Sequence, residues 1–379
     1  MIVKNKKLGR NIMVLAIFLA FMGMGVVDPI LPDIARKLGA NHWQVEMLFS
    51  AYILMMAFMM LPAGVLATKY GDKVIMVSGL GLVSVFATLC ALSNSIFEIS
   101  LFRAGWGFSN AMFFSTALVI LIALSHEYQK AVSLFEGAIG FGISAGPLLG
   151  GLLGNHSWRY PFLATGALTL IAFIAVILFV KIPKAQDKRK SISLADLKAL
   201  FSNKKFILIS ISAMLYFYGF IVVLAYSPLV VNLNPIEIGL LFFGWGLALA
   251  CGSIIISTKL EKMYKVKQII PVSVFIFSMI LLCIMGTNSK SLMIMLIILS
   301  GLLSGINNSL LTSYVMEINF EKNIISGGFN FLRWMGAACA PIISGYIAGV
   351  TNNMQLPFLI AALLSLISCL LLFKLRVAK

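Results

Sequence analysis

Apolar residues along the chain gather into twelve runs that are separated by short polar breaks. Each run is long enough to form a helix of roughly 20 residues, the length that crosses the hydrocarbon core of a membrane. The pattern therefore predicts an all-α integral membrane protein with twelve transmembrane helices. The expected spans lie near residues 11–31, 45–67, 74–93, 96–124, 131–154, 160–181, 206–231, 236–258, 268–287, 291–316, 324–349 and 355–374.

Composition supports this prediction. Of the 379 residues, 60% are hydrophobic and 11% are charged, whereas soluble domains carry about 25% charged residues. A soluble enzyme, a disordered chain and a secreted disulfide scaffold are all excluded by so little charge. The five cysteines fall inside apolar runs, where a small buried hydrophobe is the expected role.

The positive charges follow the predicted topology. Most of the 29 Lys and Arg residues lie in the breaks on the same side as the N-terminus, and cytoplasmic loops carry such an excess. We therefore expect a multi-pass protein of the cell (plasma) membrane with both termini in the cytoplasm. The net charge of +16 then reflects orientation, and no nucleic-acid partner is expected. The exceptions are Arg36, Lys37, Arg159 and Lys290 in the other breaks, and Arg103 and Arg333 inside spans.

The longest polar break divides the spans into two sets of six. It predicts an N-terminal six-helix bundle over residues 1–181, a cytoplasmic linker over 182–205 and a C-terminal six-helix bundle over 206–379. Ser193 and Asp196 resemble a capping box, which predicts a short amphipathic helix inside the linker. Residues of the first half recur about 194 positions later, which indicates an internal repeat of a kind known in transporters. The recurring residues are Leu66, Tyr70, Lys73 and Pro147, matched by Leu260, Tyr264, Lys267 and Pro341.

Glycines repeat every four residues along the fifth predicted span. At 3.6 residues per turn they form one stripe without side chains, against which a neighbouring helix can pack closely. A proline beside the stripe bends the helix. The residues concerned are Gly142, Gly146, Pro147, Gly150, Gly151 and Gly154.

These motifs resemble those of a known family. Gly142 to Gly151 resembles the antiporter signature of the major facilitator superfamily, in its twelve-span drug:proton antiporter branch (multidrug efflux type). Gly64 to Lys73 is similar to that superfamily's cytoplasmic loop motif, Arg103 with Gly107 to its fourth-span motif, and Gly25 to Pro32 to its first-span motif. The resemblance implies the major facilitator fold, alternating access between two six-helix halves, and proton-driven export of toxic compounds.

The loop motif departs from the family pattern in its charges. The family usually has an acid where this chain has Thr68, and a basic residue where it has Asp72. In the family that acid helps to hold the halves in the outward-facing state. The resemblance therefore implies a gating role for Gly64, Lys69, Gly71 and Lys73, and our hypothesis is that Asp72 supplies the missing negative charge.

Four ionisable residues are predicted to lie deep in spans, where each costs several kcal/mol unless it is paired or hydrated. They are Asp28, Arg103, Glu136 and Arg333. At about 1.5 Å per residue, Asp28 and Arg103 differ in depth by about 5 Å, so they could pair. A carboxylate in a dry cavity tends to hold its proton, and a nearby cation favours release. We expect Asp28 to be the leading proton-coupling residue, Glu136 the second, and Arg103 to act with them.

Polar and aromatic residues inside the spans provide candidates for a substrate site. Arg333 is the charged candidate of the second half. Packing in the core, contact with lipid or hydrogen bonding between helices is the more usual role of such residues. The candidates are Tyr52, Met56, Asn110, Tyr218, Trp245, Asn308, Asn330, Arg333 and Trp334.

We therefore predict a proton-coupled exporter of hydrophobic or cationic drugs, whose partners are small molecules, protons and membrane lipid, acting as a monomer. The alternative is the same fold exporting an endogenous metabolite, siderophore, sugar or lipid. A membrane enzyme is least favoured, because the sequence contains no His-Glu-x-x-His, Gly-x-Ser-x-Gly or phosphate-loop pattern. No cofactor and no metal are expected.

Overall fold

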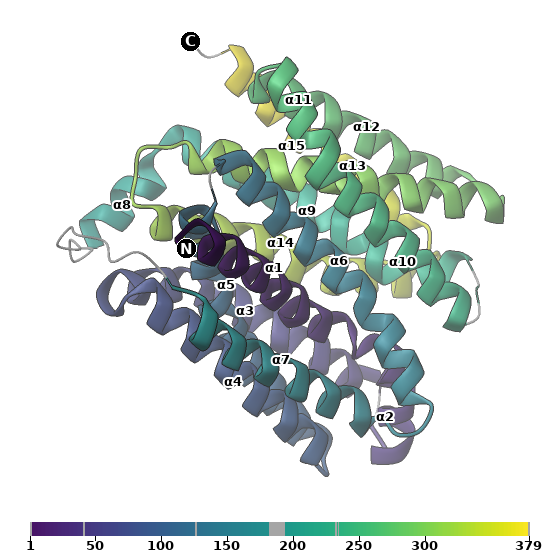
Figure 1. Cartoon of the computed structure of the whole chain (residues 1–379). Helices are drawn as coiled ribbons and strands as arrows, with labels where there is room; N and C mark the ends of the chain where they lie inside the picture. The colour runs from purple at the N-terminus through teal and green to yellow at the C-terminus, as the bar shows by residue number, and fades with distance from the viewer. Residues whose placement is uncertain are drawn as a thin grey trace.

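The computed structural model describes residues 2–377 apart from 41, 126, 182–193, 232 and 234. Nearly all of the described chain is helical (Figure 1). In chain order the elements are α1 Ile2–Gly25, the 3-10 helix η1 Asp28–Ile30, α2 Leu31–Leu38, α3 His42–Tyr70, α4 Asp72–Leu92, α5 Ile96–Leu124, α6 Tyr128–Gly154, α7 Arg159–Phe179, α8 Leu194–Ser202, α9 Lys204–Val231, α10 Pro235–Cys251, the π-helix η2 Gly252–Ile256, α11 Ser257–Met263, α12 Val266–Gly286, α13 Lys290–Met316, α14 Lys322–Thr351 and α15 Leu356–Val377.

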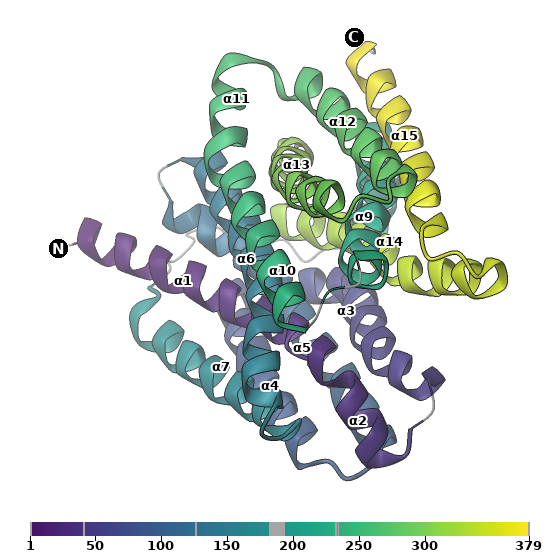
Figure 2. The same ribbon diagram turned by 90° about the vertical axis from the view of Figure 1, so that its right-hand side faces the viewer.

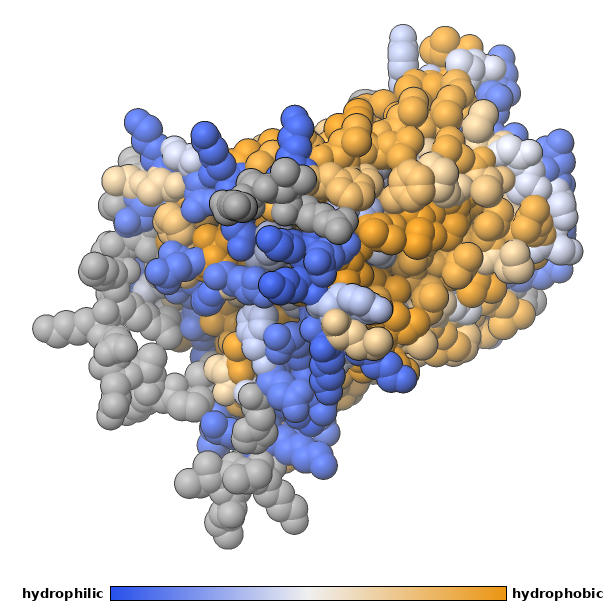
Figure 3. Space-filling view, turned by 90° about the horizontal axis from the view of Figure 1, so that it is seen from above, coloured by the Kyte–Doolittle hydropathy of each residue, from blue (hydrophilic) through white to orange (hydrophobic). Residues whose placement is uncertain are grey.

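Twelve of the helical stretches in the described chain are long and apolar enough to cross a membrane, which confirms the number of spans. Successive spans alternate in direction, so Ile2 and Val377 lie at the same face of the bundle. We call this the terminal face and the opposite one the far face. Apolar side chains cover the middle of the surface in Figure 3, and polar side chains gather toward its ends, as expected when lipid surrounds the middle.

The first span ends earlier than predicted. Helix α1 stops at Gly25, and the chain then forms η1 and the short helix α2. Pro29 and Pro32 stand at the starts of these two elements. Proline has no backbone N–H group, so it is tolerated at a helix start and cannot extend a preceding helix. The expectation of one helix through residue 31 was wrong, and with it the depth assigned to Asp28.

The eighth span is also not one regular helix. The π-helix η2 separates α10 from α11. Gly252, its first residue, lies so close to the Leu302 carbonyl oxygen of α13 that a side chain there would clash. An inserted π turn leaves the run of apolar residues unbroken, which is why hydropathy did not indicate it.

Contacts between the first six and the last six spans run along two pairs of helices. Helix α3 packs on α14, and α6 packs on α10, the second pair lying side by side in Figures 1 and 2. Small residues allow the close approach: Gly140 of α6 lies against Leu249 of α10, and Gly64 of α3 against Gly327 of α14. The division into two bundles and a linker stays a prediction. Helix α8 occupies the described end of the predicted linker, and its Leu200 is buried.

The glycine stripe of α6 packs on α1. A Cβ atom at Gly142 would lie 2.5 Å from the Phe18 carbonyl oxygen, and one at Gly146 would lie 2.5 Å from the Met22 carbonyl oxygen. These are backbone atoms, so a flexible side chain cannot move aside. By contrast, a Cβ at Gly151 would meet nothing within 4 Å. The stripe is therefore a tight contact between helices, and Gly151 lies outside it.

This difference gives a matched test. Gly146→Ala is expected to lower the free energy of unfolding by about 1–3 kcal/mol, the usual cost of overpacking. Gly151→Ala should leave the stability unchanged or raise it, because alanine favours helix over glycine by up to about 1 kcal/mol. Thermal unfolding of the purified protein in detergent measures both. Equal stability of the two variants would contradict the contact described above.

Candidate functional site

A buried ion pair joins the first six spans to the last six. Arg333 Nη1 on α14 lies 2.9 Å from Glu136 Oε1 on α6, and the two side chains are 2% and 1% exposed. The hydroxyl of Thr312 on α13 donates a hydrogen bond of 2.7 Å to the same carboxylate oxygen. Three helices thus meet at one carboxylate. The sequence reasoning did not pair Arg333 with Glu136, and the predicted role of Arg333 in substrate binding stays a prediction.

The pair is incompletely hydrogen-bonded. Within the described residues, Glu136 Oε2 and Arg333 Nε are buried and have no hydrogen-bond partner. Removing one member of a buried pair costs about 3–5 kcal/mol, because the other charge is left uncompensated. The two groups therefore hold α6 and α14 together as long as Glu136 is ionised, and one carboxylate oxygen remains available to a proton or a cation.

Aromatic rings surround the Arg333 guanidinium. Its Cζ atom lies 5.0 Å from the ring centroid of Phe217, 5.3 Å from that of Phe329 and 6.0 Å from that of Phe114. These distances are within the range of cation–π attraction. We call Glu136, Thr312, Phe114, Phe217 and Phe329 together the guanidinium cage. Its members come from α5, α6, α9, α13 and α14.

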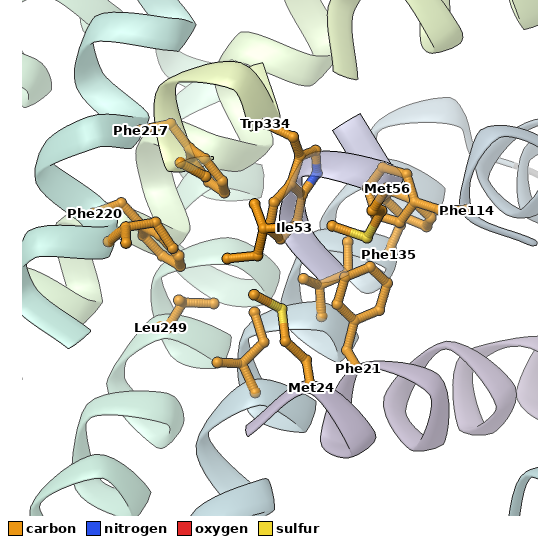
Figure 4. Packing of buried hydrophobic residues seen from close by; sticks show 14 of the residues in the cluster. Phe21, Met24, Ile53, Met56, Phe114, Phe135, Phe217, Phe220, Leu249 and Trp334 are labelled. Carbon is orange, nitrogen blue, oxygen red and sulfur yellow. The ribbon is translucent and has the colours of Figure 1, made fainter. Parts of the chain in front are cut away.

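The cage borders a packed apolar core between the two sets of spans. Trp334 lies between Phe217 and Phe114, with ring centroids 5.2 Å and 6.3 Å away (Figure 4). Phe21 of α1 stacks on Trp334 at 6.2 Å. Of the predicted substrate residues, Trp334 and Met56 lie in this core, and both are fully buried.

The remaining predicted substrate residues lie at the edge of this core or outside it. Trp245 is at the edge, because it packs on Phe220 with centroids 5.4 Å apart, and Phe220 stacks on Phe217 at 4.6 Å. Tyr218 hydrogen-bonds Ser344 over 2.8 Å. Asn330 donates to the Ser326 carbonyl oxygen of its own helix. Asn308 is buried on α13, one turn from Thr312. The predicted set therefore does not form a single surface in this arrangement, and its role in binding stays a prediction.

Arg103 has a cluster of its own inside the first six spans. It is fully buried and donates from Nε to the Leu48 carbonyl oxygen over 3.2 Å. Its guanidinium lies 4.4 Å from the Tyr52 ring centroid and 5.2 Å from that of Trp106. Asn110 donates to the Tyr52 hydroxyl over 2.5 Å. Two predicted substrate residues, Tyr52 and Asn110, thus line the site of this arginine.

Asp28 is described only by its backbone, in η1 beyond the end of α1. Its side chain is outside the described residues, so the expected pair with Arg103 stays a prediction.

At the terminal face, a polar contact joins α4 to α14. Asn323 donates a hydrogen bond of 2.7 Å to the Asp72 carboxylate. Beside it, a Cβ atom at Gly64 would lie 2.7 Å from the Asn323 carbonyl oxygen. Asp72 thus does make an anionic contact across the two sets of spans, although whether it gates stays a prediction. Asn323 was missed by the sequence reasoning, because one amide near a helix start gives no distinctive signal.

The other predicted gating residues lie within the first six spans. Lys73 donates to the Val180 carbonyl oxygen at the end of α7 over 2.8 Å. The ammonium of Lys69 lies 5.2 Å from the Tyr70 ring centroid, and Gly71 takes a positive φ of 99° between α3 and α4, a conformation that favours glycine.

A cluster of buried hydroxyls forms a further contact between the sets. Ser133 of α6 lies 3.1 Å from Ser309 of α13 and 3.3 Å from Ser257 of α11. Ser253 in the π-helix donates to the Ser133 carbonyl oxygen over 2.8 Å. Single serines in apolar spans are common, so the sequence did not indicate that these four would meet.

Twelve membrane spans, with an ion pair buried between the first six and the last six, define a polytopic membrane protein. The chain belongs to the Major Facilitator Superfamily, whose family model matches residues 13–336 and 232–379. It is 38% identical to the multidrug efflux protein YfmO of Bacillus subtilis (strain 168) over 88% of this chain and 84% of that protein. It is 28% identical to the quinolone resistance protein NorA of Staphylococcus aureus (strain Mu50 / ATCC 700699) over 92% of each.

Solved structures show the same fold. The human organic anion transporter MFSD10 (TETRAN) matches with a TM-score of 0.84 at 16% identity, covering 97% of this chain and 99% of that one. The transporter FucP in its outward conformation matches with a TM-score of 0.77 at 15% identity, covering 98% and 99%. These likenesses confirm the predicted fold class.

The contact at Asp72 can be tested by exchanging its partners. Asn323→Asp is expected to push the ends of α4 and α14 apart, because two carboxylates then face each other. Adding Asp72→Asn should restore the contact between α4 and α14, since an amide again donates to a carboxylate. The hydrogen bond of 3.3 Å from the Asn323 side chain to Glu321 is lost in both variants, so their difference reports the contact with position 72. The distance between spin labels on the two helix ends, with the transport rate as a second readout, measures the effect. An unchanged distance in Asn323→Asp would show that the contact does not hold this face.

Proposed function

We propose that this protein is a proton-driven exporter, which exchanges protons for hydrophobic cationic compounds across the cell membrane by alternating access. Membership of the Major Facilitator Superfamily supports transport of a small molecule. Similarity to proteins named for multidrug efflux and quinolone resistance supports the direction of transport and the kind of cargo. The single observation that carries the proton coupling is the buried carboxylate of Glu136, held between the two sets of spans.

Antiport requires that proton and substrate exclude one another. A carboxylate does this for a cation, because protonation removes the negative charge that the cation needs. An anionic substrate would behave in the opposite way, since protonation of Glu136 would free Arg333 to bind it and both would travel together. Exchange of protons for cargo at Glu136 therefore fits a cationic compound, or a zwitterion whose cationic group binds the carboxylate.

The contacts on the terminal face and the buried ion pair suggest how the exchange is linked to movement. With the Lys- and Arg-rich terminal face in the cytoplasm, the Asp72–Asn323 contact and the Ser133 hydroxyl cluster lie on the cytoplasmic side of the centre. Both must separate for the substrate to enter from inside. Loss of the Glu136–Arg333 attraction on protonation weakens the hold of α6 on α14 at the centre.

Two carboxylates are candidates for coupling. The sequence favours Asp28 and then Glu136, whereas the described contacts support Glu136. Asp28 remains the second candidate, although α1 ends before it and the depth argument that placed it near Arg103 no longer holds.

A transport assay tests the proposal. In proteoliposomes with an imposed pH gradient, the wild-type protein should move ethidium against its gradient, and collapse of the pH gradient should stop it. Glu136→Gln should reduce this transport to the level of liposomes without protein, because the amide does not exchange a proton. Asp28→Asn, assayed in parallel, shows whether that residue shares the role. Glu98→Gln serves as control, since Glu98 is an exposed acid whose carboxylate accepts a hydrogen bond from the Asn94 backbone N–H just before its own helix.

Each result has a clear meaning. Wild-type transport by Glu136→Gln, with its usual response to the pH gradient, would remove Glu136 from the coupling mechanism. Absence of dye transport by the folded wild-type protein would contradict the proposed cargo and favour an endogenous metabolite.

A further inference from the structure

We infer that Arg333 is an internal substitute for the substrate, and that its guanidinium occupies the site in which a lipophilic organic cation binds. This inference rests on the proposed function for its biological meaning, although the binding itself can be tested without transport. The ligand class is a monovalent organic cation with aromatic or aliphatic substituents.

The composition of the guanidinium cage carries the inference. Proteins bind organic cations with aromatic rings and a carboxylate, which together replace the water around the charge. The cage offers Phe114, Phe217 and Phe329 at cation–π distances and the Glu136 carboxylate at 2.9 Å. Phe114 and Glu136 come from the first six spans and the others from the last six, which is where an alternating-access transporter places its substrate.

Arg333 is bonded more weakly than an arginine with a purely structural role. Within the described residues its hydrogen bonds leave from Nη1 alone, to Glu136 and Thr312, while Nε has no partner. Arg159 shows the contrast, because its two terminal nitrogens donate to the Ala91 and Ser93 carbonyl oxygens and to the Asn94 side chain. A guanidinium has five N–H donors, so most of those on Arg333 are unused. Its departure would break few hydrogen bonds, and an incoming cation would replace its charge beside Glu136.

An internal cation explains how a buried carboxylate survives when the site holds no cargo. With Arg333 in place the centre is neutral, and Glu136 is never an isolated buried charge. A substrate cation must displace the guanidinium. Only those protein molecules in which Arg333 has left the cage can therefore bind the cation. A cage that is open for a tenth of the time or less lowers the apparent affinity about tenfold or more.

Binding of two probes of the same shape and opposite charge tests the inference. Tetraphenylphosphonium is the cation and tetraphenylborate the anion, and equilibrium binding to the purified protein in detergent measures both. Arg333→Gln is expected to bind the cation at least about tenfold more tightly than the wild type, because the competitor is gone. It should also show a larger rise in unfolding temperature with the cation than the wild type does. Arg159→Gln, the matched control, should bind both probes like the wild type.

Other results would overturn the inference. A folded Arg333→Gln protein with unchanged or weaker cation binding would show that Arg333 does not occupy the cation's place. Selective loss of tetraphenylborate binding would make Arg333 an anchor for anions, which also contradicts it.

A second pair of variants keeps the test decisive if Arg333→Gln does not fold. Glu136→Gln is compared with Glu136→Gln/Arg333→Gln, in which the cage has no charge. The double variant should bind tetraphenylphosphonium more tightly than the single one, and equal binding would overturn the inference. Since no gradient is involved, failure of proton-driven export with tighter cation binding in Arg333→Gln would count against the proposed function alone.

Discussion

The ion pair between Glu136 and Arg333 is the interaction on which the arrangement of the two sets of spans depends. Each charge is buried almost completely, and neither could remain there alone without a cost of about 3–5 kcal/mol. Because one charge belongs to α6 and the other to α14, the need to keep them together fixes how the two sets meet at the centre. The same need makes the contact sensitive to any proton or cation that reaches the carboxylate.

The surrounding packing suits a contact that must form and separate. Where helices of the two sets approach most closely, one side offers a glycine, as at Gly64 and Gly327 or at Gly140 opposite Leu249. Such surfaces interlock little. Polar contacts such as the Asp72–Asn323 hydrogen bond lie beside them, and water can replace the partners in these contacts. Inside the first six spans, the stripe of α6 against α1 is tight and continuous. Separation of the two sets therefore breaks polar contacts that water can replace, whereas separation of α6 from α1 would disrupt a continuous glycine stripe.

Much of the fold could be predicted from hydropathy, because apolar runs of this length have one stable form in a membrane. The number of spans and the first and last residues of α5 follow directly from such runs. The early end of α1 depends on Pro29 and Pro32 acting together with Gly25, and the π-helix depends on the contact of Gly252 with α13. Both are set by local geometry that an apolar run does not record.

The site was harder to predict than the fold. The cost of placing a charge inside the membrane singled out Glu136 and Arg333. They are separated by 197 positions in the chain, however, and no sequence pattern shows which buried charges meet. Reasoning from depth joined Asp28 to Arg103 and left Glu136 and Arg333 in separate roles. Asn323 and the serines around Ser133 gave no signal at all, because their chemistry arises only from being brought together.

The central claim is that proton and substrate cation compete for the Glu136 carboxylate. The most direct measurement is the affinity of the purified protein for tetraphenylphosphonium as a function of pH, compared between the wild type and Glu136→Gln. Linkage requires the wild-type affinity to fall as the pH is lowered, because protons then occupy the carboxylate, and the dependence should disappear in Glu136→Gln. The same pH dependence in both proteins would contradict the account.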